Sequence, residues 1–159
     1  YTVFHIFDTD GRRFRFLDHP QKMGEANFSG MCFWKDNRYF VTGSHYHFKN
    51  NTRFVENRSI CVNVLSAAQQ DLSALFANRD VTMADRFAQV AWLPLSTGAP
   101  ALEGALVNFD GIITHIHDVG SHSIFITELR DIRLPAESAH GLAYFNRAYH
   151  RLGEAQASA

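Results

Sequence analysis

The amino-acid sequence predicts a mainly β fold, an antiparallel barrel with one or two short helices packed on its outside. Short apolar or alternating runs, typical of strands, occupy both halves of the 159-residue chain. Helical spacing of apolar residues is confined to the middle of the chain, between residues 66 and 89. The order is therefore strands, a helical stretch and then strands again, with no internal repeat.

The first half predicts two strand pairs and a buried strand. "TVFHIF" (2–7) and "RRFRFL" (12–17) flank "DTDG", the pattern of two antiparallel strands about a glycine-containing turn. "MCFW" (31–34) and "RYFVTG" (38–43) flank "KDN" and form a second such pair. "SICVNVL" (59–65) is apolar enough to be a buried strand.

Two helices are predicted after that strand. Ser66 followed three residues later by Gln69 is a capping-box pattern, and the helix extends through Asn78. Its apolar face consists of residues at helical spacing: Leu72, Leu75 and Phe76. "TMADRFAQ" predicts a second, shorter helix with Thr82 as its cap and Asp85 in its first turn.

The second half returns to strands. After a predicted loop, "LPLSTGAP", the runs "GALVNFDGIITHIH" and "SIFITELRDIRL" are expected to form two long strands joined by "DVGS". "GLAYF" predicts a final strand before "NRAYHRL". We expect a single domain over residues 1–152 and a flexible tail over residues 153–159.

Composition excludes several classes of function. A net charge of −1 gives no electrostatic basis for binding nucleic acid. No apolar run approaches the ~20 residues that span a bilayer, and no signal-peptide pattern begins the chain. Two cysteines, expected to be reduced, fit a cytoplasmic protein. No nucleophile elbow, P-loop or dinucleotide-binding glycine pattern occurs.

Histidines are the first candidates for chemistry. His115 and His117 lie two residues apart, on one face of a predicted strand, and His45 and His47 form a second such pair. This spacing can hold a metal ion. Because neither pair has a Cys, Asp or Glu ligand at a diagnostic spacing, we predict no metal and treat both pairs as ordinary surface residues.

His122 differs because it follows a predicted turn, between Ser121 and Ser123. Ligand sites on β scaffolds often lie where a hairpin re-enters the sheet. A turn histidine bound to the backbone explains the same position. The residues by themselves leave both interpretations open.

Four segments together resemble the flavin reductase family of the FMN-binding split barrel, and in particular the reductase components of two-component aromatic hydroxylases. The segments are "ICVNVLSAAQQDLSALFA", "DRFAQVAW", "GAPALEGALVNFDGIITHIHDVGSHSIFITEL" and "GLAYFNRAYH". They cover about residues 54–152, in the family's order and spacing. The resemblance implies a Greek-key split barrel.

The first 53 residues depart from the family pattern. Members of the family usually carry a Gly-x-Thr-Ala-Ser-like segment and a Pro-Pro pair that help to hold the flavin. Here "GEANFSGMCFWKDNRYFVTGSHYHFKNN" has the glycine without the Thr-Ala-Ser run or the proline pair. The nearest chemical substitutes for flavin contacts in this segment are Ser29, Ser44 and Asn51.

The resemblance implies hydride transfer from NADH or NADPH to FMN or FAD, in a homodimer that supplies reduced flavin to a partner monooxygenase. His122 matches the histidine on the nicotinamide side of the flavin. The other matching positions border the flavin site or its mouth: Phe76, Ala77, Arg86, Tyr144, Arg147 and Tyr149. Core packing for Phe76, a solvated helix charge for Arg86 and strand packing for Tyr144 are the alternatives.

Two other functions fit the same sequence. One is a flavin-binding module without reductase activity, which is favoured if the altered amino-terminal half leaves no room for the nicotinamide. The other is a β-barrel protein-interaction domain without a cofactor, which the 13% aromatic content would suit. The sequence does not distinguish FMN from FAD or NADH from NADPH.

Overall fold

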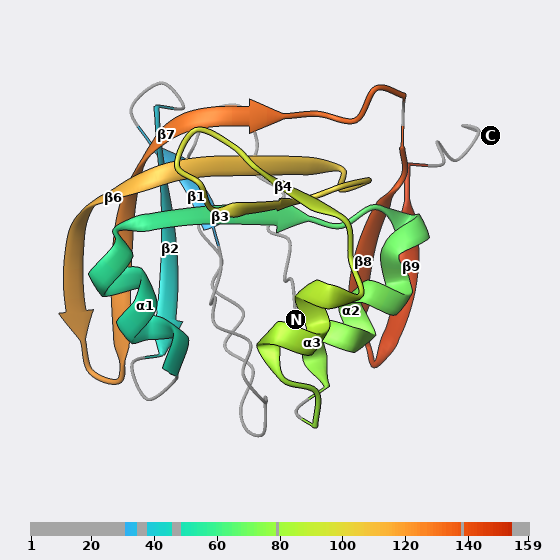
Figure 1. Ribbon diagram of the computed structural model, residues 1–159, viewed down its shortest axis with the longest axis horizontal. Coiled ribbons are helices and arrows are strands. Elements are labelled where there is room, and N and C mark those ends of the chain that lie inside the picture. Colours follow the sequence, from blue (N-terminus) through green and yellow to red (C-terminus); the bar gives the residue numbers. More distant parts are fainter. Residues whose placement is uncertain (1–30, 35–37, 46–48, 79, 138, 154–159) are drawn as a thin grey trace.

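The structure is a computed structural model that describes residues 31–34, 38–45, 49–78, 80–137 and 139–153 (Figure 1). Its strands are β1 (Met31–Trp34), β2 (Tyr39–His45), β3 (Ser59–Val64), β4 (Trp92–Pro94), β5 (Pro100–Leu102), β6 (Val107–Val119), β7 (His122–Arg133), β8 (Gly141–Phe145) and β9 (Ala148–Leu152). Its helices are α1 (Lys49–Asn57), the 3-10 turn η1 (Ala67–Gln69), α2 (Gln70–Ala77) and α3 (Met83–Ala88).

A five-stranded sheet in the order β1-β2-β7-β6-β3 forms the centre of the molecule, and all its neighbours are antiparallel. Two separate ribbons, β4–β5 and β8–β9, flank this sheet (Figure 1). The prediction of a mainly β, antiparallel fold is therefore confirmed. Within the described residues β1 and β3 end the sheet without pairing with each other, so the closed split barrel stays a prediction.

Most of the expected elements occur where the sequence placed them. The capping box is present, because Gln69 Oε1 accepts a hydrogen bond of 3.1 Å from the backbone N–H of Ser66. Thr82 caps α3 by accepting from the backbone N–H of Asp85. The long β6–β7 hairpin and β8 are also confirmed.

Four of the described elements were not predicted: α1, β4, β5 and β9. Helix α1 has only Phe54 and Val55 as apolar residues, so its helical period is too weak to detect. The predicted loop "LPLSTGAP" instead has paired flanks, β4 and β5. The segment after Phe145 forms β9, which pairs back on β8. The count of one or two helices is therefore wrong, because three α-helices are described.

Other predictions lie outside the described residues. These are the strand pair at residues 2–7 and 12–17, Ser29, His47 and residues 154–159 of the tail. Among the residues that are described, none of the helices has the length and apolar character needed to cross a bilayer.

Two apolar clusters hold the fold together. The first lies on one face of the central sheet, where α1 adds Phe54 against Phe125 at 5.9 Å between ring centroids. Its fully buried members are Phe40, Ile60, Ile113 and Phe125. The second consists of Leu65, Leu102 and Leu142, with residues of α2, α3 and β9 packed around it. Burial of one such side chain stabilises the fold by about 1.5–3 kcal/mol.

Gly111 is predicted to be intolerant of substitution, because it lies on β6 at a register shift under the first cluster. A Cβ atom there would lie 2.6 Å from the backbone oxygen of Glu128 and 2.7 Å from Thr127 Cγ2. We expect Gly111→Ala to lower the free energy of unfolding by roughly 1–3 kcal/mol in a urea titration. Gly141→Ala is the matched control, since its nearest contact would be an ordinary 3.5 Å. Equal stability of the two variants would contradict the packing described.

Candidate functional site

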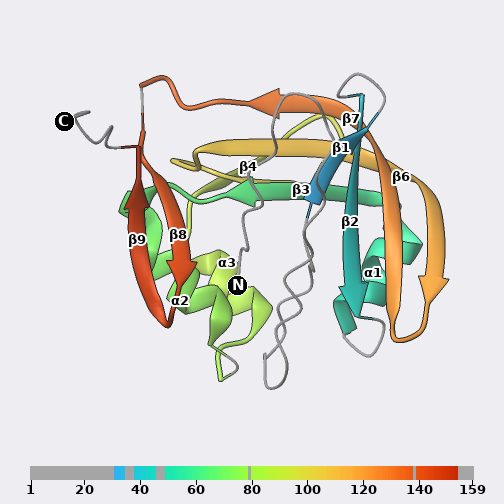
Figure 2. The same cartoon turned by 180° about the vertical axis from the view of Figure 1, so that it is seen from behind.

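The residues that the sequence singled out fall into two groups at opposite ends of the molecule. His122 begins β7 at the β6–β7 hairpin, whereas α2, α3 and the β8–β9 hairpin carry most of the other candidates. Figures 1 and 2 show these two hairpins at opposite ends of the long axis in both views. Within one chain, the structure therefore does not bring His122 together with Tyr144, Arg147 and Tyr149.

His122 is half-buried at the hairpin tip, and its ring is held by its neighbour. Gly120 supplies a positive φ of 57° in the turn, where glycine carries no steric penalty. The Nδ1 atom of His122 lies 3.0 Å from the hydroxyl of Ser121. Beside it the buried Ser123 donates a 2.7 Å hydrogen bond to Asp118 Oδ1. The ring is thus positioned by a side chain rather than only by the turn backbone.

Two further candidates, Ser44 and Asn51, lie at the same end of the molecule as this hairpin (Figure 1). Ser44 is the register partner of Ser123, and the next residue of β2, His45, is the partner of His122. Asn51 lies on α1, which stands at the same end of the molecule as the hairpin (Figure 1). The backbone therefore groups Ser44 and Asn51 with His122, a grouping that the sequence did not predict.

At the other end, Phe76 and Arg86 make internal contacts. The ring of Phe76 meets the ring of Phe87 edge-on at 5.3 Å, which supports packing as at least part of its role. Arg86 is only 4% exposed, so the alternative of a solvated helix charge is wrong. Its guanidinium donates to the backbone oxygen of Asn78, at the end of α2, and contacts the sulfur of Met83. Ala77 is exposed on the last turn of α2.

The β8–β9 hairpin presents the remaining candidates. Asn146 and Arg147 both have positive φ angles, 49° and 62°, as a tight two-residue hairpin turn requires. Tyr144 and Tyr149 are directly opposed, with ring centroids 4.9 Å apart. The hydroxyl of Tyr149 donates a 3.0 Å hydrogen bond to Ser73 Oγ on α2. Tyr149 therefore ties the hairpin to the helix and leaves Arg147 exposed at the tip.

A buried carboxylate that the sequence reasoning missed fixes the β4–β5 connection to the sheet. Asp110 on β6 is fully buried, and its two oxygens accept from the backbone N–H and the hydroxyl of Thr97, at 2.8 and 2.5 Å. Asp131, its register partner on β7, accepts a 3.1 Å hydrogen bond from Ser96. An aspartate inside an apolar strand was the available signal, because buried charges need partners.

Cys61 is the register partner of Asp110 on the neighbouring strand β3. Burial, reinforced by the charges of Asp110 and Asp131, raises the pKa of the Cys61 thiol from 9.0 to about 12. Because the thiolate is the nucleophile and metal ligand, Cys61 is suited to neither role near neutral pH. The raised pKa favours the fold below pH 9, and this contribution is lost as the pH rises toward about 12.

We therefore expect iodoacetamide to alkylate Cys61 slowly at neutral pH in the folded protein and readily in urea. A Cys32→Ser variant leaves Cys61 as the remaining cysteine, so that mass spectrometry reads a single site. Alkylation of the folded variant as fast as a free cysteine peptide would contradict the raised pKa.

Across the residues that the structure covers, no three side chains of the His, Cys, Asp and Glu types gather as a metal cage. The candidate side chains at the two ends are aromatic rings, hydroxyls, an imidazole and an exposed guanidinium, which can bind and orient a ligand. This is the set of groups that a protein uses to position an organic cofactor.

Comparison with known proteins identifies the family. Residues 50–153 match the family described as the flavin reductase like domain, which is well over half of the chain. The chain belongs to this family. The matched span of the flavin reductase domain includes His122, the α2–α3 candidates and the β8–β9 hairpin, whereas Ser29 and Ser44 precede it.

Individual relatives agree with this family. The reductase component of 4-hydroxyphenylacetate 3-monooxygenase from Pseudomonas aeruginosa is 42% identical over 103 residues, which are 64% of this chain and 60% of the relative. The FMN reductase (NADH) RutF of Enterobacter sp. strain 638 is 47% identical over 100 residues, 62% of this chain and 59% of the relative. The chain thus spans about 60% of the length of these curated relatives.

A solved structure extends the similarity to three dimensions. A protein from Haemophilus somnus 129pt, provisionally assigned as a flavin reductase, superposes with a TM-score of 0.72 at 36% identity. The superposition covers 77% of this chain and 78% of the other. The chain therefore shares its fold with most of that protein.

Proposed function

We propose that this flavin reductase domain transfers hydride from NADH or NADPH to FMN or FAD and supplies the reduced flavin to a separate monooxygenase. The observation that carries the proposal is the family match over residues 50–153. Two of its relatives support the finer points, because one is named as a monooxygenase reductase component and another as an NADH-dependent FMN reductase.

The flavin and nicotinamide supply the redox chemistry, so the protein has to bind them, orient them and exclude water. No proton-transfer dyad is required. A half-buried imidazole, tyrosine rings and hydroxyls are therefore sufficient to bind and orient the flavin and the nicotinamide. The thiol of Cys61 stays protonated near neutral pH, which is consistent with a reaction that needs no nucleophile from the protein.

The α2 and β8–β9 end offers groups that fit a flavin. Phe76 and Tyr144 provide half-buried aromatic surface for a ring system, and Arg147 provides an exposed cation for a phosphate. We propose that these residues, with Ala77 and Tyr149, border the cofactor. Because both terminal nitrogens of Arg86 make contacts inside the protein, its proposed phosphate contact rests on the family resemblance alone.

The β6–β7 end fits a nicotinamide-orienting role. We propose that His122 contacts the dihydropyridine and that Ser121 sets the orientation of its ring through the 3.0 Å contact at Nδ1. Ser44 and Asn51 belong to the same end by backbone position and are proposed as flavin contacts there. Ser29 is proposed as a flavin contact on sequence grounds only.

The separation of the two ends supports a homodimer. If one active site uses both His122 and the β8–β9 residues, the two groups must come from different copies, because a single chain holds them apart (Figures 1 and 2). We therefore propose a homodimer with flavin near the subunit interface. A single domain over residues 1–152 and a cytoplasmic location are also proposed, from the sequence.

The proposed function predicts that the purified protein binds FMN or FAD and consumes NAD(P)H only when flavin is present. Flavin fluorescence quenching measures the binding, and NAD(P)H absorbance with and without flavin measures the reaction. Flavin binding without NAD(P)H consumption would favour the carrier module, which the late start of the family match at residue 50 makes the second candidate. A folded protein with no flavin affinity below millimolar would contradict both functions.

A further inference from the structure

His115 and His117 have no part in the proposed function, yet they form a distinctive pair on β6. Ile116 between them packs toward the core, so strand alternation places both imidazoles on the opposite, exposed face. Their rings are nearly parallel, at an interplanar angle of 6°, with centroids 6.4 Å apart. Two exposed imidazoles are thus held side by side by a single strand.

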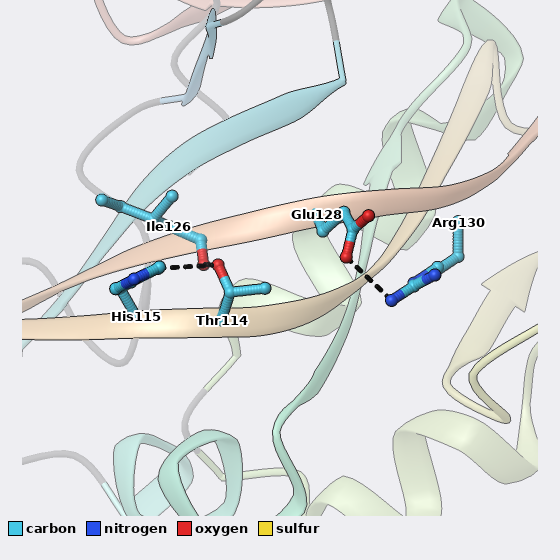
Figure 3. Close-up of polar contacts among 5 residues, drawn as sticks. All are labelled: Thr114, His115, Ile126, Glu128 and Arg130. Atoms are coloured by element: carbon cyan, nitrogen blue, oxygen red, sulfur yellow. Dashed lines mark hydrogen bonds and ion pairs between the residues drawn. The ribbon is translucent and has the colours of Figure 1, made fainter.

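Hydrogen bonding fixes the tautomer of His115. The hydroxyl of Thr114 donates to the backbone oxygen of Ile126 at 3.1 Å and lies 3.0 Å from His115 Nδ1 (Figure 3). A hydroxyl has one hydrogen. Because that hydrogen is directed to Ile126, the Thr114 oxygen accepts from His115, whose Nδ1 must carry the proton. The lone pair of the neutral ring is then on Nε2.

A bulge explains how adjacent residues make this contact. The register of β6 against β7 shifts between Ile113 and His115, which leaves Thr114 as the extra residue. A histidine whose second nitrogen donates to a fixed oxygen is the usual arrangement of a metal-binding imidazole. The bulge and Thr114 therefore prepare His115 to act as an Nε2 ligand.

An acidic side chain on the neighbouring strand, Glu128, lies two residues from Ile126, the register partner of His115, and is already paired. Glu128 makes a 2.8 Å ion pair with Arg130, and its carboxylate points toward Arg130 and away from His115 (Figure 3). Since the described residues hold no group of three or more metal-ligating side chains, any ion here would have two protein ligands and water for the rest. Such an ion would exchange readily with solution.

We propose that His115 and His117 form an exchangeable surface site for a divalent transition metal ion such as Ni²⁺, Cu²⁺ or Zn²⁺, with Thr114 as a positioning residue. This departs from the sequence-based prediction of no metal, because the contact of Thr114 with His115 and the parallel rings could not be predicted from residue spacing. Imidazole nitrogen suits these ions, in contrast to Mg²⁺ and Ca²⁺. Because His117 is exposed, its ring can turn to place a second nitrogen beside the one that Thr114 orients. The site is distinct from the proposed flavin chemistry and does not require it.

Titration calorimetry with Ni²⁺ on the full chain tests the site. Wild type should bind a Ni²⁺ ion that His115→Ala and His117→Ala each lose, with unchanged circular dichroism. Two controls should retain it: His150→Ala, an exposed histidine on β9, and the double variant His45→Ala, His47→Ala, which removes the other His-x-His pair. Retention in His115→Ala, or loss in the His45, His47 double variant, would overturn the proposal.

Variants of Thr114 test whether its hydroxyl positions His115, because two histidines that bind Ni²⁺ without help from Thr114 would be insensitive to its replacement. Thr114→Val keeps the shape of the side chain but removes the acceptor, and should weaken Ni²⁺ binding by roughly 10-fold, as loss of an outer-shell partner typically does. Thr114→Ser retains the hydroxyl and should restore the affinity. Equal affinities in the valine and serine variants would contradict the positioning role.

Discussion

Asp110→Ala is expected to lower the free energy of unfolding by roughly 2–5 kcal/mol. The substitution removes a fully buried carboxylate and leaves the backbone N–H and the hydroxyl of Thr97 without their acceptor. It also releases the connection between β4 and β5 from the central sheet. Urea unfolding followed by circular dichroism measures the change.

Asp131 provides the matched control, because it is the register partner of Asp110 but is half-exposed and bonded to a serine side chain. Asp131→Ala should lower the stability by about 1 kcal/mol or less. Asp110→Asn retains one acceptor and should fall between the two. The structural role assigned to Asp110 is wrong if Asp110→Ala and Asp131→Ala are equally stable.

His122→Ala should slow reduction of flavin by NAD(P)H by roughly 5- to 150-fold in kcat/KM, an effect of about 1–3 kcal/mol on the transition state. Flavin affinity should change much less. The reason is position, since His122 stands at the β6–β7 tip, whereas most of the proposed flavin-binding groups, those on α2, α3 and the β8–β9 hairpin, lie at the other end of the chain. Stopped-flow reduction beside a flavin titration separates the two effects.

His117→Ala, assayed in buffer free of transition metals, is the control for His122. It removes an exposed imidazole from the same hairpin without touching the tip. Ser121→Ala should give an intermediate loss of rate, because it removes only the partner of Nδ1. Equal rates of flavin reduction in wild type and His122→Ala, at unchanged flavin affinity, would contradict the proposed role of His122 in orienting the nicotinamide.

Local signals in the sequence account for the elements that could be predicted. Ser66 and Gln69 are three residues apart and cap each other, so their pattern is visible without the fold. The long β6–β7 hairpin is equally local, because its two strands adjoin a short glycine turn. Helix α1 was missed because it is polar and short, and depends on packing of Phe54 against Phe125.

The candidate site was less predictable because its contacts join distant parts of the chain. Tyr149 meets Ser73 across 76 residues, and Asp110 meets Thr97, which lies in the connection between β4 and β5. The burial of Arg86 likewise depends on the end of α2 lying over α3. Sequence patterns indicate residue types at such positions but not the partners that tertiary packing supplies.

Anaerobic titration of the flavin-loaded protein with NADH and with NADPH is the most direct measurement of whether this domain is a reductase. Oxidised flavin is yellow, and hydride transfer bleaches it. We predict complete bleaching by at least one of the two nucleotides, at a rate that His117→Ala preserves and His122→Ala reduces. A protein that binds flavin and stays yellow with both nucleotides would contradict the account and leave a flavin carrier in its place.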